Sequence, residues 1–212
     1  MNFLAHAALA FDAAHCWSAN AVQTQGLLAG AVIGDYVKGR IPTDWPVALQ
    51  AGVALHRRID ALSNRHSGVQ TTCSQYPEDL RRYAPIFVDL LADHSLARDW
   101  HTYYEKVSKR NVSDACYMAV NQHLDKLPPT GIRFANYMQD VDLLANYDEW
   151  SHIEQGFKSV LRRLKVTLDP SRVLDVCTDQ ISATDTLLTT LYPDLRAEFS
   201  EWNAFNAVQG SS

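Results

Sequence analysis

Acidic and imidazole side chains fall on the apolar side of two segments that are expected to be helical. Asp89 and Asp93 are four positions apart in one segment, which places them about 40° apart on one helix face. His56 and Asp60 have the same spacing in the other segment. Because a buried carboxylate without a partner costs free energy, we expect a cation to face these groups.

Three more residues of these types lie in apolar segments, so the full set has seven members: His6, Asp35, His56, Asp60, Asp89, Asp93 and His94. They are either seven separately satisfied core residues or a group that converges on one or two divalent cations. Imidazole and carboxylate suit Mn, Fe, Zn or Ni, and water on such a metal becomes a nucleophile near neutral pH. The residues alone therefore indicate a metal-dependent hydrolase or oxidase. Di-iron oxidases carry two Glu-x-x-His pairs, and the sequence has only one, Glu149–His152.

Helices are the elements that must position these residues. Alternating strand patterns are nearly absent and apolar residues recur at helical spacing, so we predict an all-α fold. We expect a single helical domain over residues 1–212, with 203–212 as a frayed tail. Helices are predicted at 2–11, 26–40, 46–64, 85–106, 112–127, 131–147, 150–168 and 171–208, with short helices in 65–84 and a break at Pro193.

Composition limits the classes of function. The chain is 47% hydrophobic and 20% charged, which is typical of a globular protein in water. Its net charge of −5 gives no global field that attracts nucleic acid. The longest apolar run, GLLAGAVIG, is too short to span a bilayer, so we expect no membrane partner. No signal peptide is visible and the four cysteines form no CxxC pair, which predicts a cytoplasmic protein with reduced thiols.

Five short motifs carry a resemblance to a known family: MNFLAH at 1–6, GDYVKG at 34–39, LHRRID at 55–60, LLADHSLARDW at 90–100 and FANYMQDVDLLANY at 134–147. In these motifs and their order the chain resembles the bacterial acyl carrier protein phosphodiesterase family. The resemblance implies an HD-phosphohydrolase-like helical bundle and a bound Mn²⁺, with Mg²⁺ or Fe²⁺ as alternatives. It implies hydrolysis of the phosphodiester that joins 4′-phosphopantetheine to a serine of holo-acyl carrier protein, and a link to fatty acid biosynthesis.

The resemblance also implies roles for individual residues. The metal ligands would be Asp35, His56, Asp93 and His94. Asp60 would orient His56. Asp89 would be a ligand, an orienting group or a water-activating base. His6 would donate to the phosphate or complete the metal shell, and either His6 or His94 would protonate the leaving serine oxygen.

Basic residues complete this hypothesis. Lys38, Arg57 and Arg58 would balance the charge of the phosphodiester. Acyl carrier proteins are acidic, as this chain is, so docking needs a local basic surface. We expect that surface among Lys38, Arg40, Arg57, Arg58 and Arg65, with Arg81 and Arg82 as further candidates. Two alternatives remain: an HD-like phosphohydrolase acting on a nucleotide or other small phosphodiester, and a non-enzymatic helical binding module.

Overall fold

The computed structural model describes residues 1–210, and within them it confirms the all-α prediction, since no strand is present. The first helices are α1 (Phe3–Cys16), α2 (Ala21–Ile33), α3 (Val47–Arg65), α4 (Ser67–Ser74), α5 (Glu78–Arg81), α6 (Ala84–Arg98) and α7 (Trp100–Tyr103). The others are α8 (Lys109–Asn121), α9 (Pro129–Asp140), α10 (Trp150–Leu164), α11 (Pro170–Asp179), α12 (Ile181–Glu201) and α13 (Ala204–Gln209). Two 3₁₀ helices are η1 (Gly34–Tyr36) and η2 (Leu124–Lys126).

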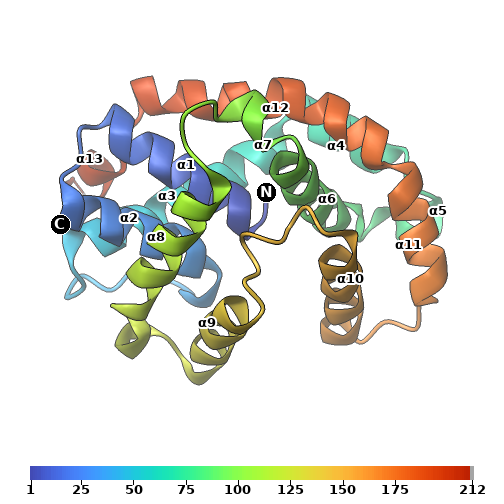
Figure 1. Ribbon diagram of the computed structural model, residues 1–212, viewed down its shortest axis with the longest axis horizontal. Helices are drawn as coiled ribbons and strands as arrows, with labels where there is room; N and C mark the ends of the chain where they lie inside the picture. The colour runs from blue at the N-terminus through green and yellow to red at the C-terminus, as the bar shows by residue number, and fades with distance from the viewer. Residues whose placement is uncertain (211–212) are drawn as a thin grey trace.

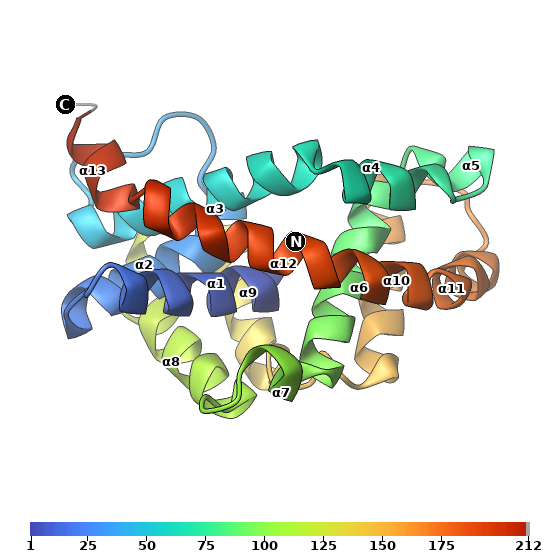
Figure 2. The ribbon, with the colours of Figure 1, turned by 90° about the horizontal axis from the view of Figure 1, so that it is seen from above.

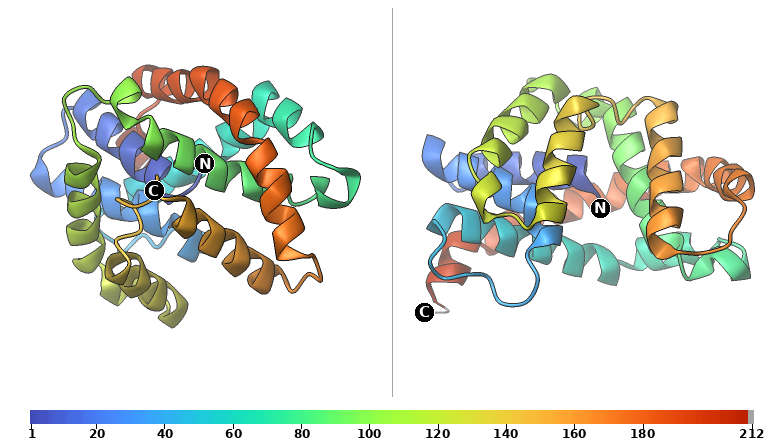
Figure 3. Two further views of the ribbon diagram at one scale, coloured as in Figure 1. Left: turned by 45° about the vertical axis from the view of Figure 1, so that its right-hand side comes forward. Right: turned by 90° about the horizontal axis from the view of Figure 1, so that it is seen from below.

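Helix α12 lies along one side of the molecule, where it contacts α1, α3, α4 and α6 (Figures 1 and 2). On the opposite side α9 and α10 project away from the body, and they flank the amino terminus when the molecule is seen from below (Figure 3). One hydrophobic core extends from Met1 to Ala204. None of the helices within residues 1–210 combines the length and the apolar character needed to cross a bilayer.

Helices α2 and α3 pack closely because glycines face each other where they cross. A Cβ atom at Gly30 would lie 2.5 Å from the carbonyl oxygen of Leu49, and one at Gly52 would lie 2.5 Å from that of Leu27. Both distances are far shorter than a van der Waals contact, so any larger residue would separate the helices. This close approach places η1, at the end of α2, beside α3.

Several predicted boundaries are wrong. The helix predicted over 26–40 ends at Ile33, and the one predicted over 131–147 ends at Asp140. The helix predicted over 85–106 ends at Arg98, and α7 follows after Asp99, whose backbone is not helical. Pro193 does not break the last long helix but lies inside α12. Although proline removes one backbone hydrogen bond, α12 buries Leu191, Tyr192 and Leu195 on either side of it, and this packing maintains the helix.

The frayed tail predicted at 203–212 is also wrong for the part that the structure describes. The side chain of Asn203 accepts a hydrogen bond from the Phe205 amide at 2.9 Å and so caps α13. Ala204 is fully buried, and the Phe205 ring meets Trp17 edge-on with centroids 6.1 Å apart. Tertiary packing therefore fixes this helix. Residues 211–212 lie outside the described residues.

Candidate functional site

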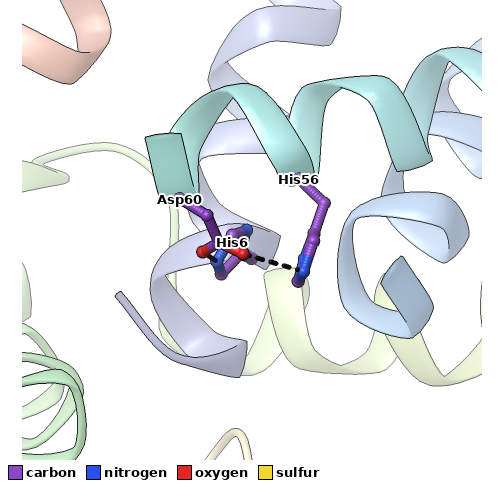
Figure 4. Close-up of side chains that lie close together, drawn as sticks. All are labelled: His6, His56 and Asp60. Carbon is purple, nitrogen blue, oxygen red and sulfur yellow. Dashed lines mark hydrogen bonds and ion pairs between the residues drawn. The ribbon is translucent and has the colours of Figure 1, made fainter. Parts of the chain in front are cut away.

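Two histidines and one aspartate form a compact cluster between α1 and α3. Helix α1 supplies His6, and α3 supplies His56 and Asp60, one turn apart (Figure 4). His6 Nε2 lies 3.0 Å from Asp60 Oδ1, and His56 Nε2 lies 3.2 Å from Asp60 Oδ2. The two imidazole rings stack with centroids 4.2 Å apart. One ligand-capable atom from each residue lies within 4.8 Å of those of the other two, which is compact enough for a single metal ion.

The backbone orients His56. Its Nδ1 lies 2.8 Å from the carbonyl oxygen of Ala31, which can only accept, so Nδ1 donates the proton. Gly34 leaves room for the ring, because a Cβ atom there would lie 2.3 Å from His56 Cγ. Histidines that bind metals commonly make this second hydrogen bond, which fixes the ring orientation. His56 Nε2 is thereby directed at Asp60.

Two further acids face the same pocket, which has a volume of about 440 Å³. Asp35, in η1, places Oδ1 3.7 Å from His56 Nε2 and is more than half exposed. Asp89, in α6, places Oδ1 2.5 Å from the α-amino nitrogen of Met1. The pocket therefore collects three carboxylates around two histidines, and the Met1 amino group is the cation that faces one of them, Asp89.

The titration of the cluster is set by burial and by mutual contacts. Burial, together with the charge of His56, lowers the pKa of His6 to about 4. Burial also acts to lower the pKa of His56, but hydrogen bonds to Asp35 and Asp60 outweigh it and raise this pKa to about 9. Burial acts to raise the pKa of Asp60, but both histidines hold it well below its usual range. Near neutral pH, His6 is thus neutral, His56 protonated and Asp60 ionised.

Asp93, a predicted metal ligand, instead caps helix α1. Its carboxylate accepts hydrogen bonds from the amides of Leu4 at 2.7 Å and of Asn2 and Ala5 at 3.2 Å. The side chain is fully buried. Amide donors and the helix dipole favour an anion at a helix amino terminus, so Asp93 has its compensating positive charge without a metal.

His94, also predicted as a ligand, links α6 to the turns after α9. Its Nδ1 donates to the carbonyl oxygen of Tyr147 at 2.8 Å, and its ring meets Trp150 edge-on with centroids 5.3 Å apart. Neither Asp93 nor His94 lines the pocket. The structure therefore does not assemble the predicted set of Asp35, His56, Asp93 and His94, and brings His6 and Asp60 to His56 instead.

The three cations predicted to hold the phosphodiester also lie elsewhere. Arg57 donates to the carbonyl oxygens of Val37 and Gly39, both at 2.8 Å, and so holds the loop after η1. Arg58 pairs with Glu198 and packs over the Trp202 ring. Lys38 is exposed in that loop, and none of the three lines the pocket.

Helix α10 provides pocket residues that the sequence analysis missed. Arg163 and His152 both line the pocket, and His152 Nδ1 is buried without a hydrogen-bond partner. The basic run at 162–165, at the end of α10, was a visible signal for Arg163. His152 lies in the Glu-x-x-His sequence of the chain, Glu149–His152, but its position at the pocket depends on the packing of α10 against α6.

The donor set fits a divalent metal. Two imidazole nitrogens and a carboxylate, without thiolate, suit Mn, Fe or Zn. His6 Nδ1 is buried without a hydrogen-bond partner, so the protein alone does not satisfy this side chain. An all-helical fold with such a cluster in a pocket defines a candidate metal centre with mixed nitrogen and oxygen donors, as metal-dependent hydrolases and oxidases use.

Comparison with known proteins gives the family. The sequence model described as acyl carrier protein phosphodiesterase matches residues 1–195. The chain is 30% identical over 205 residues to "Acyl carrier protein phosphodiesterase" of Escherichia coli strain K12 / DH10B, and 29% identical to that of O157:H7 strain EC4115. Each alignment covers 94% of this chain and 98% of the relative. The chain therefore belongs to the acyl carrier protein phosphodiesterase family, a family of enzymes.

No solved structure matches the chain. The likeness to HD phosphohydrolases that the motifs implied therefore stays a prediction.

Proposed function

We propose that this enzyme hydrolyses the phosphodiester between 4′-phosphopantetheine and a serine of holo-acyl carrier protein, releasing apo-carrier protein and 4′-phosphopantetheine. The observation that carries the proposal is the cluster of His6, His56 and Asp60 in the pocket of a chain from this family. A cytoplasmic location and a link to fatty acid biosynthesis stay predictions.

These three residues would hold the metal, with Mn²⁺ preferred and Mg²⁺ or Fe²⁺ as alternatives. His6 and His56 offer imidazole nitrogens and Asp60 a carboxylate oxygen, while Asp35, whose Oδ1 lies 3.7 Å from His56 Nε2, offers a further carboxylate oxygen. A bound divalent metal would supply polarisation of a phosphate oxygen and a nucleophilic hydroxide. The hydrogen bond from His56 to Ala31 keeps the imidazole in the ligating orientation.

The remaining pocket residues would handle charge and protons. Arg163 is the exposed cation that lines the pocket, and it would neutralise the phosphodiester in place of Lys38, Arg57 and Arg58. His152 would take over from His94 the role of proton donor to the serine oxygen, because His152 lines the pocket and His94 does not. Asp89 would act as an orienting group or as the base for water.

Aromatic side chains give the pocket an apolar wall beside its ionic one. Phe134 of α9 packs on Phe3, with ring centroids 4.4 Å apart, and on Tyr36, with centroids 5.4 Å apart. All three rings line the pocket. This wall would contact the pantetheine arm of the substrate while the cluster holds its phosphate.

The test is intact-mass spectrometry of holo-acyl carrier protein incubated with this enzyme and Mn²⁺. The proposal expects the carrier protein to lose the mass of 4′-phosphopantetheine, and expects a chelator to stop the reaction. Turnover of coenzyme A or cyclic nucleotides with an unchanged carrier protein would favour a small-molecule phosphohydrolase. No turnover and no bound metal would favour a binding module.

A further inference from the structure

Helix α10 and the residue that follows it carry four basic side chains, which we call the α10 basic edge: Lys158, Arg162, Arg163 and Lys165. All four are exposed. Only Arg163 lines the pocket that holds the histidine cluster, whereas the other three line a neighbouring hollow of about 810 Å³. The edge therefore extends from the catalytic pocket out onto the surface.

The pocket and the hollow are contiguous. Tyr137 of α9 and Gln155 and Ser159 of α10 line both of them. Figures 1 and 3 show α9 and α10 on the face away from α12, on either side of the amino terminus. A molecule that rests on the outer part of α10 therefore lies next to the mouth of the catalytic pocket.

Little negative charge within the described residues compensates this edge. Lys158 is 3.7 Å from Glu154, and no ion pair to Arg162, Arg163 or Lys165 is found in residues 1–210. Arg162 directs its Nε at the carbonyl oxygen of Lys158 at 3.3 Å. In contrast, Arg57 and Arg58, two residues of the docking surface predicted from the sequence, make contacts within the protein. The α10 basic edge is thus available to a partner.

We infer that the α10 basic edge docks the acidic carrier protein so that its prosthetic group enters the pocket past Arg163. This inference rests on the proposed function. Because the enzyme has a net charge of −5, an acidic partner is repelled overall and needs a local basic surface for productive encounter. The edge provides that surface beside the pocket, and it orients the phosphodiester toward the cluster of His6, His56 and Asp60.

Reversing charge at the outer part of the edge tests the inference. In the double variant Arg162→Glu and Lys165→Glu, the KM for holo-acyl carrier protein is expected to rise about tenfold or more with kcat unchanged. Hydrolysis of bis(p-nitrophenyl) phosphate, which needs no docking, is expected to stay the same. The matched control is Lys106→Glu, an exposed lysine between α7 and α8 that lines neither the pocket nor the hollow. An unchanged KM in the double variant would overturn the inference.

A binding measurement separates this inference from the proposed function. Fluorescence anisotropy with labelled apo-carrier protein is expected to show binding that weakens with salt and weakens about tenfold in the double variant. The neutral double variant Arg162→Gln and Lys165→Gln is expected to have an intermediate affinity. It keeps the test valid if the charge-reversed protein does not fold. If the wild type binds carrier protein at the edge without hydrolysing it, the proposed function fails and the docking surface stands. If hydrolysis occurs and both double variants bind carrier protein as tightly as the wild type, the docking inference is wrong while the proposed function stands.

Discussion

The His6–His56–Asp60 cluster and the Asp93–His94 pair contain the same residue types in different surroundings. In the cluster, a carboxylate faces two imidazole side chains and lines a pocket. In the pair, the carboxylate accepts three backbone amides and the imidazole donates to a backbone carbonyl, both within the core. Both His56 and His94 donate Nδ1 to a backbone carbonyl oxygen, but His56 also directs Nε2 at Asp60 in the pocket, whereas His94 does not line the pocket. The surroundings of the second ring nitrogen therefore separate a candidate metal ligand from a structural contact.

Removing the carboxylate of the cluster should give the largest effect. Asp60→Asn loses the anion between the two histidines, and we expect kcat for holo-acyl carrier protein to fall about 10³-fold, equivalent to about 4 kcal/mol of transition-state stabilisation. Steady-state kinetics with saturating Mn²⁺ measure this loss, and circular dichroism checks that the helices remain. Asp44→Asn, at an exposed position, should keep full activity. A kcat within threefold of wild type in Asp60→Asn would remove Asp60 from the site.

Removing the carboxylate of the pair should act on stability instead. Asp93→Ala leaves three amides of the first turn of α1 without their acceptor, and we expect the free energy of unfolding to fall by about 3 kcal/mol or more. Asp93→Asn keeps one carbonyl acceptor and should lose less. Urea denaturation measures both. If Asp93→Asn unfolds like the wild type but no longer binds Mn²⁺, then Asp93 is a metal ligand and the contrast between the cluster and the pair is wrong.

Filling the space behind His56 should weaken metal binding without removing a ligand. A methyl group at Gly34 would overlap the His56 ring, so the ring must turn away from Asp60. We expect Gly34→Ala to bind Mn²⁺ about 10- to 100-fold more weakly, as when an orienting contact of a ligand is lost. Isothermal titration calorimetry gives the affinity. Gly210→Ala, where an added methyl group meets only an ordinary 3.5 Å contact, is the control and should bind normally.

The acidity of the cluster predicts how metal uptake depends on pH. Because the pKa of His56 is raised to about 9, its Nε2 carries a proton at neutral pH that a metal must displace. His6, with its pKa lowered to about 4, has no proton to lose above pH 5. Mn²⁺ affinity should therefore rise about tenfold per pH unit between pH 6 and 8. An affinity that is flat over this range would show that His56 does not bind the metal.

Much of the fold followed from local sequence patterns. Apolar residues at helical spacing predicted helices that overlap α1, α2 and α3. Features that depend on tertiary packing were missed, such as Pro193 inside α12 and the cap that Asn203 gives to α13. Both are stable because of neighbouring elements, which a local pattern does not contain.

The candidate site was predicted in part for a similar reason. Helical spacing correctly placed His56 and Asp60 on one face and indicated that their side chains need partners. The same spacing grouped Asp89 with Asp93, but only Asp89 lines the pocket, because the amino terminus of α1 lies against Asp93. Arg163 and His152 come from a distant part of the chain, and only the packing of α10 brings them to the site.

The most direct test of the contrast between the His6–His56–Asp60 cluster and the Asp93–His94 pair is the metal content of two histidine variants. His56→Ala and His94→Ala would each be equilibrated with Mn²⁺, desalted and measured by elemental analysis beside the wild type. We predict that wild type and His94→Ala retain equal amounts of Mn²⁺ and that His56→Ala loses it. Loss of Mn²⁺ from His94→Ala with retention in His56→Ala, or no Mn²⁺ in the wild type, would contradict the account.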